Sequence, residues 1–252
     1  MTVSSMFDER LFWGKYWQSR IDYYKRSGVL FEDSFRWGYY CNQALYEHYK
    51  NILGGVRGKS ILEWGAGSGY VSCLAVQDYA SVTAIDYTSK AVEYLSIVSK
   101  VLQIRTGIRI AQGDLEDIST DNGFDGIWNC GVLEHYSDEK IVCKLREMVR
   151  LTKSNGMIIC TMPNLRSPEG LYRRLKNLLN REKRSERVIS FRHWKCLFRQ
   201  AGFKQIKILP VNYYIPSFIP GRIAYYISQN FPLTPKYLSL AWLFSLVGVV
   251  EK

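Results

Sequence analysis

The chain has 252 residues, of which 47% are hydrophobic, and this length fits one α/β domain with additions or at most two small domains. Its net charge is +11. Charged residues come too early for a signal peptide, and the longest apolar run, residues 238–250, is shorter than the roughly 20 residues of a membrane-spanning helix. These features predict a cytoplasmic protein, with peripheral contact to a membrane left open.

The first part of the chain is rich in aromatic side chains and has a helical pattern. We expect residues 1–57 to form an N-terminal helical cap and residues 58–252 to form the main domain.

The middle of the chain alternates short β-branched runs with helical patterns. Strict alternation of strand and helix indicates βαβ units, and hence a parallel sheet with helices on both faces. Ser137 is expected to cap the third of these helices. The expected strands are 60–65, 81–86, 108–114, 124–131 and 156–163, and the expected helices are 70–79, 88–103 and 138–153.

The last third of the chain departs from this alternation. We expect two insertions that form a lid or bind substrate: a basic one at about 164–194, and one at about 212–242 that four prolines interrupt. The regular elements expected here are a helix over 190–203 and strands over 204–211 and 245–252.

Six cysteines are scattered along the chain, without CxxC pairs or the spacing of a zinc site. We therefore expect buried free thiols in a reducing compartment, and no bound metal. These residues are Cys41, Cys73, Cys130, Cys143, Cys160 and Cys196.

The stretch ILEWGAGSGY, residues 61–70, places three glycines directly after an apolar run. Such a loop lets the backbone come close to a ligand or to a neighbouring helix. A Walker-type phosphate loop is excluded because no lysine follows the glycines, and the dinucleotide pattern GxGxxG is not met because Gly69 comes one place early. Taken alone, the loop leaves open a tight strand-to-helix turn.

Polar residues stand at the ends of the neighbouring strands. Asp86 ends the second strand, 21 positions after Gly65, where a carboxylate can reach ribose hydroxyls. Asp114 ends the third strand and can accept from an exocyclic amine, and the fourth strand ends in NCGVLEHY, residues 129–136. No lysine or arginine stands ready for a pyrophosphate, so these residues favour an adenosine that carries a cation.

Together these motifs resemble those of the class I S-adenosylmethionine-dependent methyltransferases. The resemblance rests on ILEWGAGSG, VTAID, GDLEDI, FDGIWNCGVLEHY and GMIICTMPN, and covers roughly residues 55–210. It implies a Rossmann-like, doubly wound α/β fold with seven mostly parallel strands, the last one antiparallel. It also implies S-adenosyl-L-methionine as cofactor and S-adenosyl-L-homocysteine as product.

The resemblance implies roles for the first two strand ends. The backbone of Gly65 and Gly67 would approach the methionine portion of the cofactor. Glu63 would lie beneath that portion, directed toward its amine, and Asp86 would bind the ribose diol.

It also implies roles further along the chain. Asp114 and the Leu115 backbone would frame the adenine, and Asn129 would offer its carbonyl to the amino group. Trp64 departs from the small apolar residue common in the family and is expected to fill the helix–sheet interface. Tyr16 is the candidate N-terminal cap over the cofactor, with a packing role as the alternative. The full set of expected cofactor contacts is Tyr16, Glu63, Gly65, Ala66, Gly67, Gly69, Asp86, Tyr87, Asp114, Leu115 and Asn129.

His135 is the candidate catalytic residue, because it follows the fourth strand near the expected position of the methyl group. Methyl transfer is an in-line displacement, and a base is needed only when the nucleophile arrives protonated. A histidine near neutral pKa can take a phenol or hydroxyl proton. Packing or capping of the next helix is the alternative for His135. We expect His193 to pack and His48 to be solvated on a helix.

The absence of several motifs narrows the range of possible methyl acceptors. No [DNS]PP[YF] follows the fourth strand, no Pro-Cys pair is present, and the double glutamate of arginine methyltransferases is not evident. What remains resembles the small-molecule, quinone and glycan biosynthetic methyltransferases.

Nearly all of the excess charge lies in residues 166–207, with thirteen lysines and arginines against three glutamates. Residues 171–194 have the pattern of a basic amphipathic helix, which can lie on an anionic membrane. A solvated lid helix is one alternative. A nucleic-acid surface is another, and the small number of nearby aromatic residues disfavours it.

We therefore predict methyl transfer to a small or lipid-linked biosynthetic acceptor, at oxygen. One alternative is an RNA or protein methyltransferase that docks its substrate on residues 166–207. Another is a non-catalytic module with the same fold, which the intact Gly65, Asp86 and Asp114 disfavour.

Overall fold

A computed structural model of the chain describes residues 9–34, 36–164, 167, 170–171, 187, 189–213 and 241–251. None of the helices formed by these residues is long and apolar enough to cross a membrane. Most of the expected basic helix over 171–194 and of the insertion over 212–242 lies outside the described residues, as do residues 1–8 of the expected cap.

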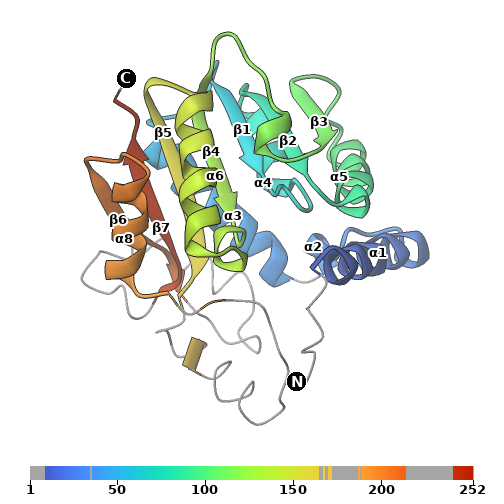
Figure 1. Ribbon diagram of the computed structural model, residues 1–252. Coiled ribbons are helices and arrows are strands. Elements are labelled where there is room, and N and C mark those ends of the chain that lie inside the picture. Colours follow the sequence, from blue (N-terminus) through green and yellow to red (C-terminus); the bar gives the residue numbers. More distant parts are fainter. Residues whose placement is uncertain are drawn as a thin grey trace.

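One sheet organises the described part of the chain, in the strand order β3-β2-β1-β4-β5-β7-β6 (Figure 1). Its strands are β1 (Ser60–Trp64), β2 (Ser81–Asp86), β3 (Ile108–Gln112), β4 (Phe124–Cys130), β5 (Thr152–Pro163), β6 (Ile206–Tyr213) and β7 (Ala241–Val249). Pairing is parallel from β3 to β5, whereas β7 is antiparallel to both of its neighbours. The predicted Rossmann-like sheet, mostly parallel with its last strand antiparallel, is confirmed.

Helices cover both faces of this sheet (Figure 1). One face carries α3 (Arg36–Ile52), α4 (Tyr70–Gln77) and α5 (Ser89–Val101), and the other carries α6 (Asp138–Leu151) and α8 (Phe191–Gln200). The N-terminal helix α1 (Glu9–Ser27) packs on α5 and is followed by the short α2 (Phe31–Ser34). Ser137 caps α6 as predicted, since its hydroxyl accepts from the Lys140 backbone N–H.

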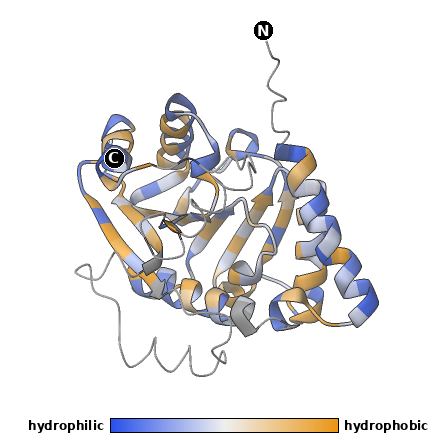
Figure 2. Cartoon of the chain, turned by 90° about the horizontal axis from the view of Figure 1, so that it is seen from below, coloured by the Kyte–Doolittle hydropathy of each residue, from blue (hydrophilic) through white to orange (hydrophobic). Residues whose placement is uncertain are grey.

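Each face of the sheet has its own apolar core. Met148, Trp194 and Phe198 are buried between the sheet and the α6–α8 layer. On the other face, Tyr49 and Trp128 stack with ring centroids 4.9 Å apart. Figure 2 shows apolar strands in the middle of the molecule and hydrophilic residues on the outer sides of the helices. Burial of this apolar surface is the main force that holds the helices to the sheet.

The boundary between α6 and β5 differs from the prediction. We expected the helix to run to residue 153 and the strand to begin at 156, but β5 begins at Thr152. Thr152 pairs with Phe124 of β4, and the register shifts between Phe124 and Gly126. Its hydroxyl also donates to the Met148 carbonyl at 2.7 Å. This pairing extends β5 to Thr152, although the sequence pattern at that position continues the one of α6.

The last strand also begins earlier than predicted. We expected residues 245–252, whereas β7 spans Ala241–Val249. Its N-terminal half pairs with Pro163 and Met162 of β5. These partners are far away in the sequence, so the local pattern could not predict the earlier start.

All six cysteines are free, but only Cys73 and Cys160 are buried as predicted, whereas Cys41 and Cys130 are partly buried. Cys143 and Cys196 are exposed, because each lies on the side of its helix that faces away from the sheet.

Candidate active site

The turn after β1 brings the backbone into a pocket at the carboxyl ends of the strands. Gly65 and Gly67 have φ angles of +67° and +55°, which side chains rarely adopt. A Cβ on Gly65 would lie 2.5 Å from the Val132 side chain, and one on Gly67 would lie 2.6 Å from the Trp17 ring. These two glycines are therefore needed both for the turn and for the close approach of their neighbours.

Gly69 of the same turn has a different role. Its φ is +62°, and a Cβ there would lie 2.3 Å from Leu95 of α5. This third glycine allows α4 to start close to α5, and it does not line the pocket. Ala66 is buried and its N–H donates to the Ile85 carbonyl of β2 at 2.9 Å.

Asp86 ties the end of β2 to the glycine turn. Its carboxylate accepts from the Gly67 N–H at 3.1 Å and from the Thr88 N–H at 2.8 Å. Burial raises the pKa of Asp86, and these backbone hydrogen bonds oppose the rise. The side chain is 5% exposed and contributes to the pocket lining, as does the adjacent Tyr87. Asp86 thus lies at the end of its strand, as the sequence pattern predicted, and this end is at the pocket.

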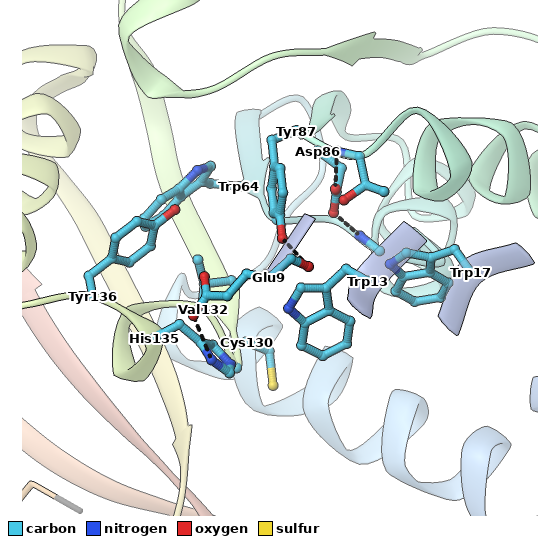
Figure 3. Close-up of a pocket in the computed structure, with 14 residues that line it drawn as sticks. Glu9, Trp13, Trp17, Trp64, Asp86, Tyr87, Cys130, Val132, His135 and Tyr136 are labelled. Carbon is cyan, nitrogen blue, oxygen red and sulfur yellow. Dashed lines mark hydrogen bonds and ion pairs between the residues drawn. The ribbon is translucent and has the colours of Figure 1, made fainter. Parts of the chain in front are cut away.

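The pocket has aromatic walls from three parts of the chain (Figure 3). Trp64 and Tyr136 stack with centroids 5.9 Å apart and an interplanar angle of 21°. Trp13 and Trp17 come from α1 on the opposite side (Figure 3). The described lining residues are Glu9, Trp13, Trp17, Trp64, Gly65, Gly67, Asp86, Tyr87, Thr88, Cys130, Gly131, Val132, His135 and Tyr136.

Charge in the pocket favours a cationic ligand. Glu9 and Asp86 are the acidic residues of the described lining, which contains no lysine or arginine. Aromatic faces attract cations through their quadrupoles. Carboxylates and aromatic rings together can therefore hold a positively charged group, and they offer nothing to a phosphate.

His135, the candidate catalytic residue, lines this pocket. Its side chain is 10% exposed, and its Nδ1 is 3.7 Å from Oε1 of Glu9. Its ring meets Trp13 edge-to-face with centroids 5.8 Å apart. The Tyr87 hydroxyl is 3.5 Å from the Glu9 carbonyl, so the first turn of α1 lies between the end of β2 and the loop after β4 (Figure 3).

Tyr16 does not line the pocket, although its helix does. Its hydroxyl accepts from Nη2 of Arg20 at 2.9 Å, and the Arg20 guanidinium lies over its ring. Trp13 and Trp17 take the inward positions instead. Their four-residue spacing is the signal in the sequence that places both on one helix face.

Glu63 lies behind the glycine turn, on the α4 side of the sheet. It is 6% exposed, and the Ser72 hydroxyl of α4 donates to it. Burial raises the pKa of Glu63 to about 7. The carboxyl group is therefore poised to change its charge near neutral pH, one residue away from the stacked Trp64.

Asp114 lies behind the aromatic wall formed by Trp64, where its carboxylate has partners on other elements. It accepts from the Trp64 indole N–H at 2.9 Å and pairs with the Lys144 ammonium at 2.8 Å. Leu115, whose N–H donates to Asp114 at 2.7 Å, has a fully buried side chain in the core. Lys144 also pairs with Glu116 at 2.6 Å. Sequence reasoning missed this lysine, because it is 30 positions from Asp114 and lies on another element.

Asn129 is fully buried at the end of β4, next to the pocket-lining Cys130. Its main-chain carbonyl accepts from the Tyr49 hydroxyl at 3.1 Å, and its amide nitrogen lies 3.3 Å from the Cys160 sulfur.

The other two histidines lie away from the pocket lining. His48 is not solvated as we predicted: its Nε2 is 3.1 Å from the Ser245 hydroxyl, and burial lowers its pKa to about 4. His193 lies on the exposed side of α8, with its Nε2 2.8 Å from Asp138. No group of three or more potential metal ligands occurs among the residues that the structure describes.

Comparisons with known proteins agree with this geometry. Residues 62–160 match the family model described as a methyltransferase domain. No curated protein matches the chain in sequence.

Solved structures share the fold at low sequence identity. Magnesium protoporphyrin IX methyltransferase (ChlM) from Synechocystis PCC 6803, solved with bound SAH, has a TM-score of 0.62 at 15% identity, over 96% of this chain and 98% of that chain. A chain of the complex between the Haloferax volcanii methyltransferase activator Trm112 and a protein described as a methyltransferase matches with a TM-score of 0.61 at 15% identity, over 97% of each chain. The apo S-adenosylmethionine-dependent methyltransferase SibL matches with a TM-score of 0.60 at 16% identity. That match covers 86% of this chain but only 56% of SibL.

The sheet order and the glycine turn are those of a Rossmann-like fold, and the residues that match the family model lie within it. Residues 62–160 match a methyltransferase domain, and the fold of the whole sheet is the one found in S-adenosylmethionine-dependent methyltransferases of known structure.

Proposed function

We propose that the protein transfers a methyl group from S-adenosyl-L-methionine to an oxygen atom of a small or lipid-linked biosynthetic acceptor. The observation that carries this proposal is the pocket at the ends of β1, β2 and β4. A buried carboxylate, a glycine turn and aromatic walls meet there beside His135.

The residues present fit this cofactor. Gly65 and Gly67 of the turn line the pocket, and Asp86 stands at the end of β2, where carboxylates bind ribose hydroxyls. Two carboxylates and the rings of Trp13, Trp17 and Tyr136 suit a ligand with a positive charge. The bound cofactor would supply a methyl group that its positive sulfur has already activated.

His135 would act as the general base for an acceptor hydroxyl. An alcohol or phenol has to lose its proton as the new bond forms, and an imidazole can accept it. The Glu9 carboxylate, 3.7 Å from Nδ1, would stabilise the imidazolium that results. This pair is the reason for proposing oxygen as the accepting atom.

The N-terminal helix would exclude water during transfer. We propose residues 1–57 as a cap on the domain formed by residues 58–252, because Trp13 and Trp17 of α1 form one wall of the pocket. Holding the acceptor at attack distance in a dry site can lower the barrier by several kcal/mol.

Support for a small acceptor comes from a structural neighbour. ChlM is named for a porphyrin substrate, and it matches this chain over nearly its full length. The basic insertion at about 164–194 would then cover the acceptor, or touch an anionic membrane that supplies a lipid-linked one.

The test is transfer of labelled methyl from S-adenosyl-L-methionine into a host-cell extract, with the Asp86→Ala variant as the blank. The extract is then separated into organic-soluble, small aqueous, nucleic-acid and protein fractions. We expect label in the organic or small aqueous fraction. Label confined to nucleic acid or protein would overturn the proposed acceptor class.

The second candidate is an RNA or protein methyltransferase. The observation in its favour is the net charge of +10 in residues 166–207, from thirteen basic and three acidic residues. Binding to RNA through this segment would weaken steeply as salt rises, because bound counterions are released. RNA binding that does not depend on salt, or no binding at all, would exclude the RNA version.

A further inference from the structure

Arg187, at the end of the basic insertion, holds the loop that follows β4. Its backbone N–H donates to the Glu134 carbonyl at 3.1 Å, and its Nη1 donates to the Tyr136 carbonyl at 2.7 Å. These two carbonyls flank His135. His135 and Tyr136 both line the pocket, whereas Arg187 does not. Arg187 therefore holds the backbone on both sides of His135 from outside the pocket.

The same guanidinium also reaches the first turn of α6. Its Nη2 lies 2.8 Å from Oδ1 of Asp138. The second carboxylate oxygen, Oδ2, lies 2.8 Å from Nε2 of His193 on α8. The hydrogen bond from Arg187 lowers the pKa of Asp138, so the carboxylate keeps its charge for this contact. Arg187 thus joins the loop, α6 and, through Asp138, α8.

Leu133 anchors the loop in the core, and the backbone around His135 forms only a short turn. This turn is the 3-10 helix η2 (Leu133–His135), and no side chain caps its start. Its internal hydrogen bonds are His135 N–H to Val132 carbonyl at 3.3 Å and Tyr136 N–H to Leu133 carbonyl at 3.1 Å. Hydrogen bonds in such turns have poorer geometry than those of an α-helix. A planar guanidinium can serve several acceptors at once, which an ammonium group cannot do in the same way.

We propose that Arg187 is a positioning residue, which fixes His135 and Tyr136 against the pocket and thereby supports cofactor binding. The inference rests on the proposed function, because S-adenosyl-L-homocysteine is used as the probe ligand.

The test compares Arg187→Met, which keeps the aliphatic stem and removes the guanidinium, with the wild-type protein. Calorimetric titration should show S-adenosyl-L-homocysteine binding weakened about tenfold, the size of effect expected when a charged hydrogen bond is lost. Amide hydrogen exchange should speed up in residues 131–137 and stay unchanged in β1. Arg187→Lys should restore binding in part, because the ammonium can serve one of the two acceptors of the guanidinium, the Tyr136 carbonyl or the Asp138 carboxylate.

Arg192→Met is the matched control, because Arg192 is an exposed residue on α8 with the same charge. It should bind the probe like the wild type. Equal binding by wild type and Arg187→Met, with unchanged exchange in the loop, would overturn the proposal. An equal loss in Arg192→Met would also overturn it, since the effect would then come from net charge.

Two further outcomes separate the possible failures. If the wild-type protein does not bind S-adenosyl-L-homocysteine, the proposed function fails, whereas the exchange measurement still decides the role of Arg187. If Arg187→Met does not fold, Arg187→Lys carries the test, and a lysine variant identical to wild type in binding and exchange would overturn the proposal.

Discussion

Glu63 is a carboxyl group that the fold keeps away from water, between β1 and α4. Burial raises its pKa to about 7, and the Ser72 hydroxyl only partly opposes this. The position of Glu63, two residues before Gly65, could be read from the sequence. Its protonation could not, because it depends on Ser72 and on the depth of the core around β1.

This pKa predicts how Glu63 affects stability. Between its ordinary value of 4.5 and about 7, the folded chain keeps a proton that the unfolded chain has lost. The stability of the wild type should therefore fall as pH rises through this window, by roughly 3 kcal/mol relative to Glu63→Gln, which cannot ionise. Urea unfolding of both proteins at pH 5 and pH 7.5 measures the difference. A difference that does not change with pH would contradict the shifted pKa.

His135 should matter for the chemical step more than for cofactor binding. Removal of a general base typically lowers the rate by about 10²-fold or more. We expect that loss in methyl transfer for His135→Gln, with S-adenosyl-L-homocysteine binding nearly unchanged. Glu9→Gln should lower the rate less, because it removes only the charge near the imidazolium. An unchanged rate in His135→Gln would leave His135 as a packing residue.

At the scale of an element, α1 determines which aromatic side chains face the pocket. The sequence pattern predicted an aromatic N-terminal helix, and from it we chose Tyr16 as the residue that covers the cofactor. The structure turns Trp13 and Trp17 inward and leaves Tyr16 with Arg20. Helical periodicity gives the relative positions of side chains, and the packing of α1 on α5 sets which face points inward.

The contact between Trp17 and the glycine turn can be tested with a double-mutant cycle. Gly67→Ala should cost about 1–3 kcal/mol of backbone strain, plus a steric cost against the Trp17 ring. Trp17→Ala removes that ring, so Gly67→Ala should cost less in its background.

Gly69→Ala is the control for this cycle. It has a similar positive φ, but its Cβ would meet Leu95 and not Trp17. Urea unfolding of the five variants should therefore show coupling to Trp17 for Gly67 and additivity for Gly69. Additive costs at both positions would mean that Trp17 does not pack on the turn in solution.

For the whole molecule, the sheet was the most predictable feature. Each parallel strand carries its own apolar run, so alternation with helices shows the βαβ order locally. The pairs Lys144–Asp114 and Arg187–Asp138 could not be predicted, because each joins elements that only the tertiary fold brings together. The start of β7 was missed for the same reason.

Cofactor binding should stabilise the whole domain. A ligand that binds only the folded chain adds about 2.7 kcal/mol at one hundred times its Kd, which corresponds to a rise in Tm of about 5–10 °C for a chain of this size. We expect S-adenosyl-L-homocysteine to raise the Tm of the wild type by this amount and to leave the Tm of the Asp86→Ala variant unchanged. A rise of equal size in Asp86→Ala would show that the carboxylate does not contribute to the site.

The acidic, aromatic lining of the pocket has a consequence for selectivity among cellular adenosine compounds. ATP and the dinucleotides share the adenosine unit and carry several negative charges. Glu9 and Asp86 would repel those charges, and no lysine or arginine of the described lining would offset the repulsion. The pocket would therefore discriminate by the sign of the charge attached to the ribose, and the enzyme would need no separate mechanism to reject the nucleotides present in large excess.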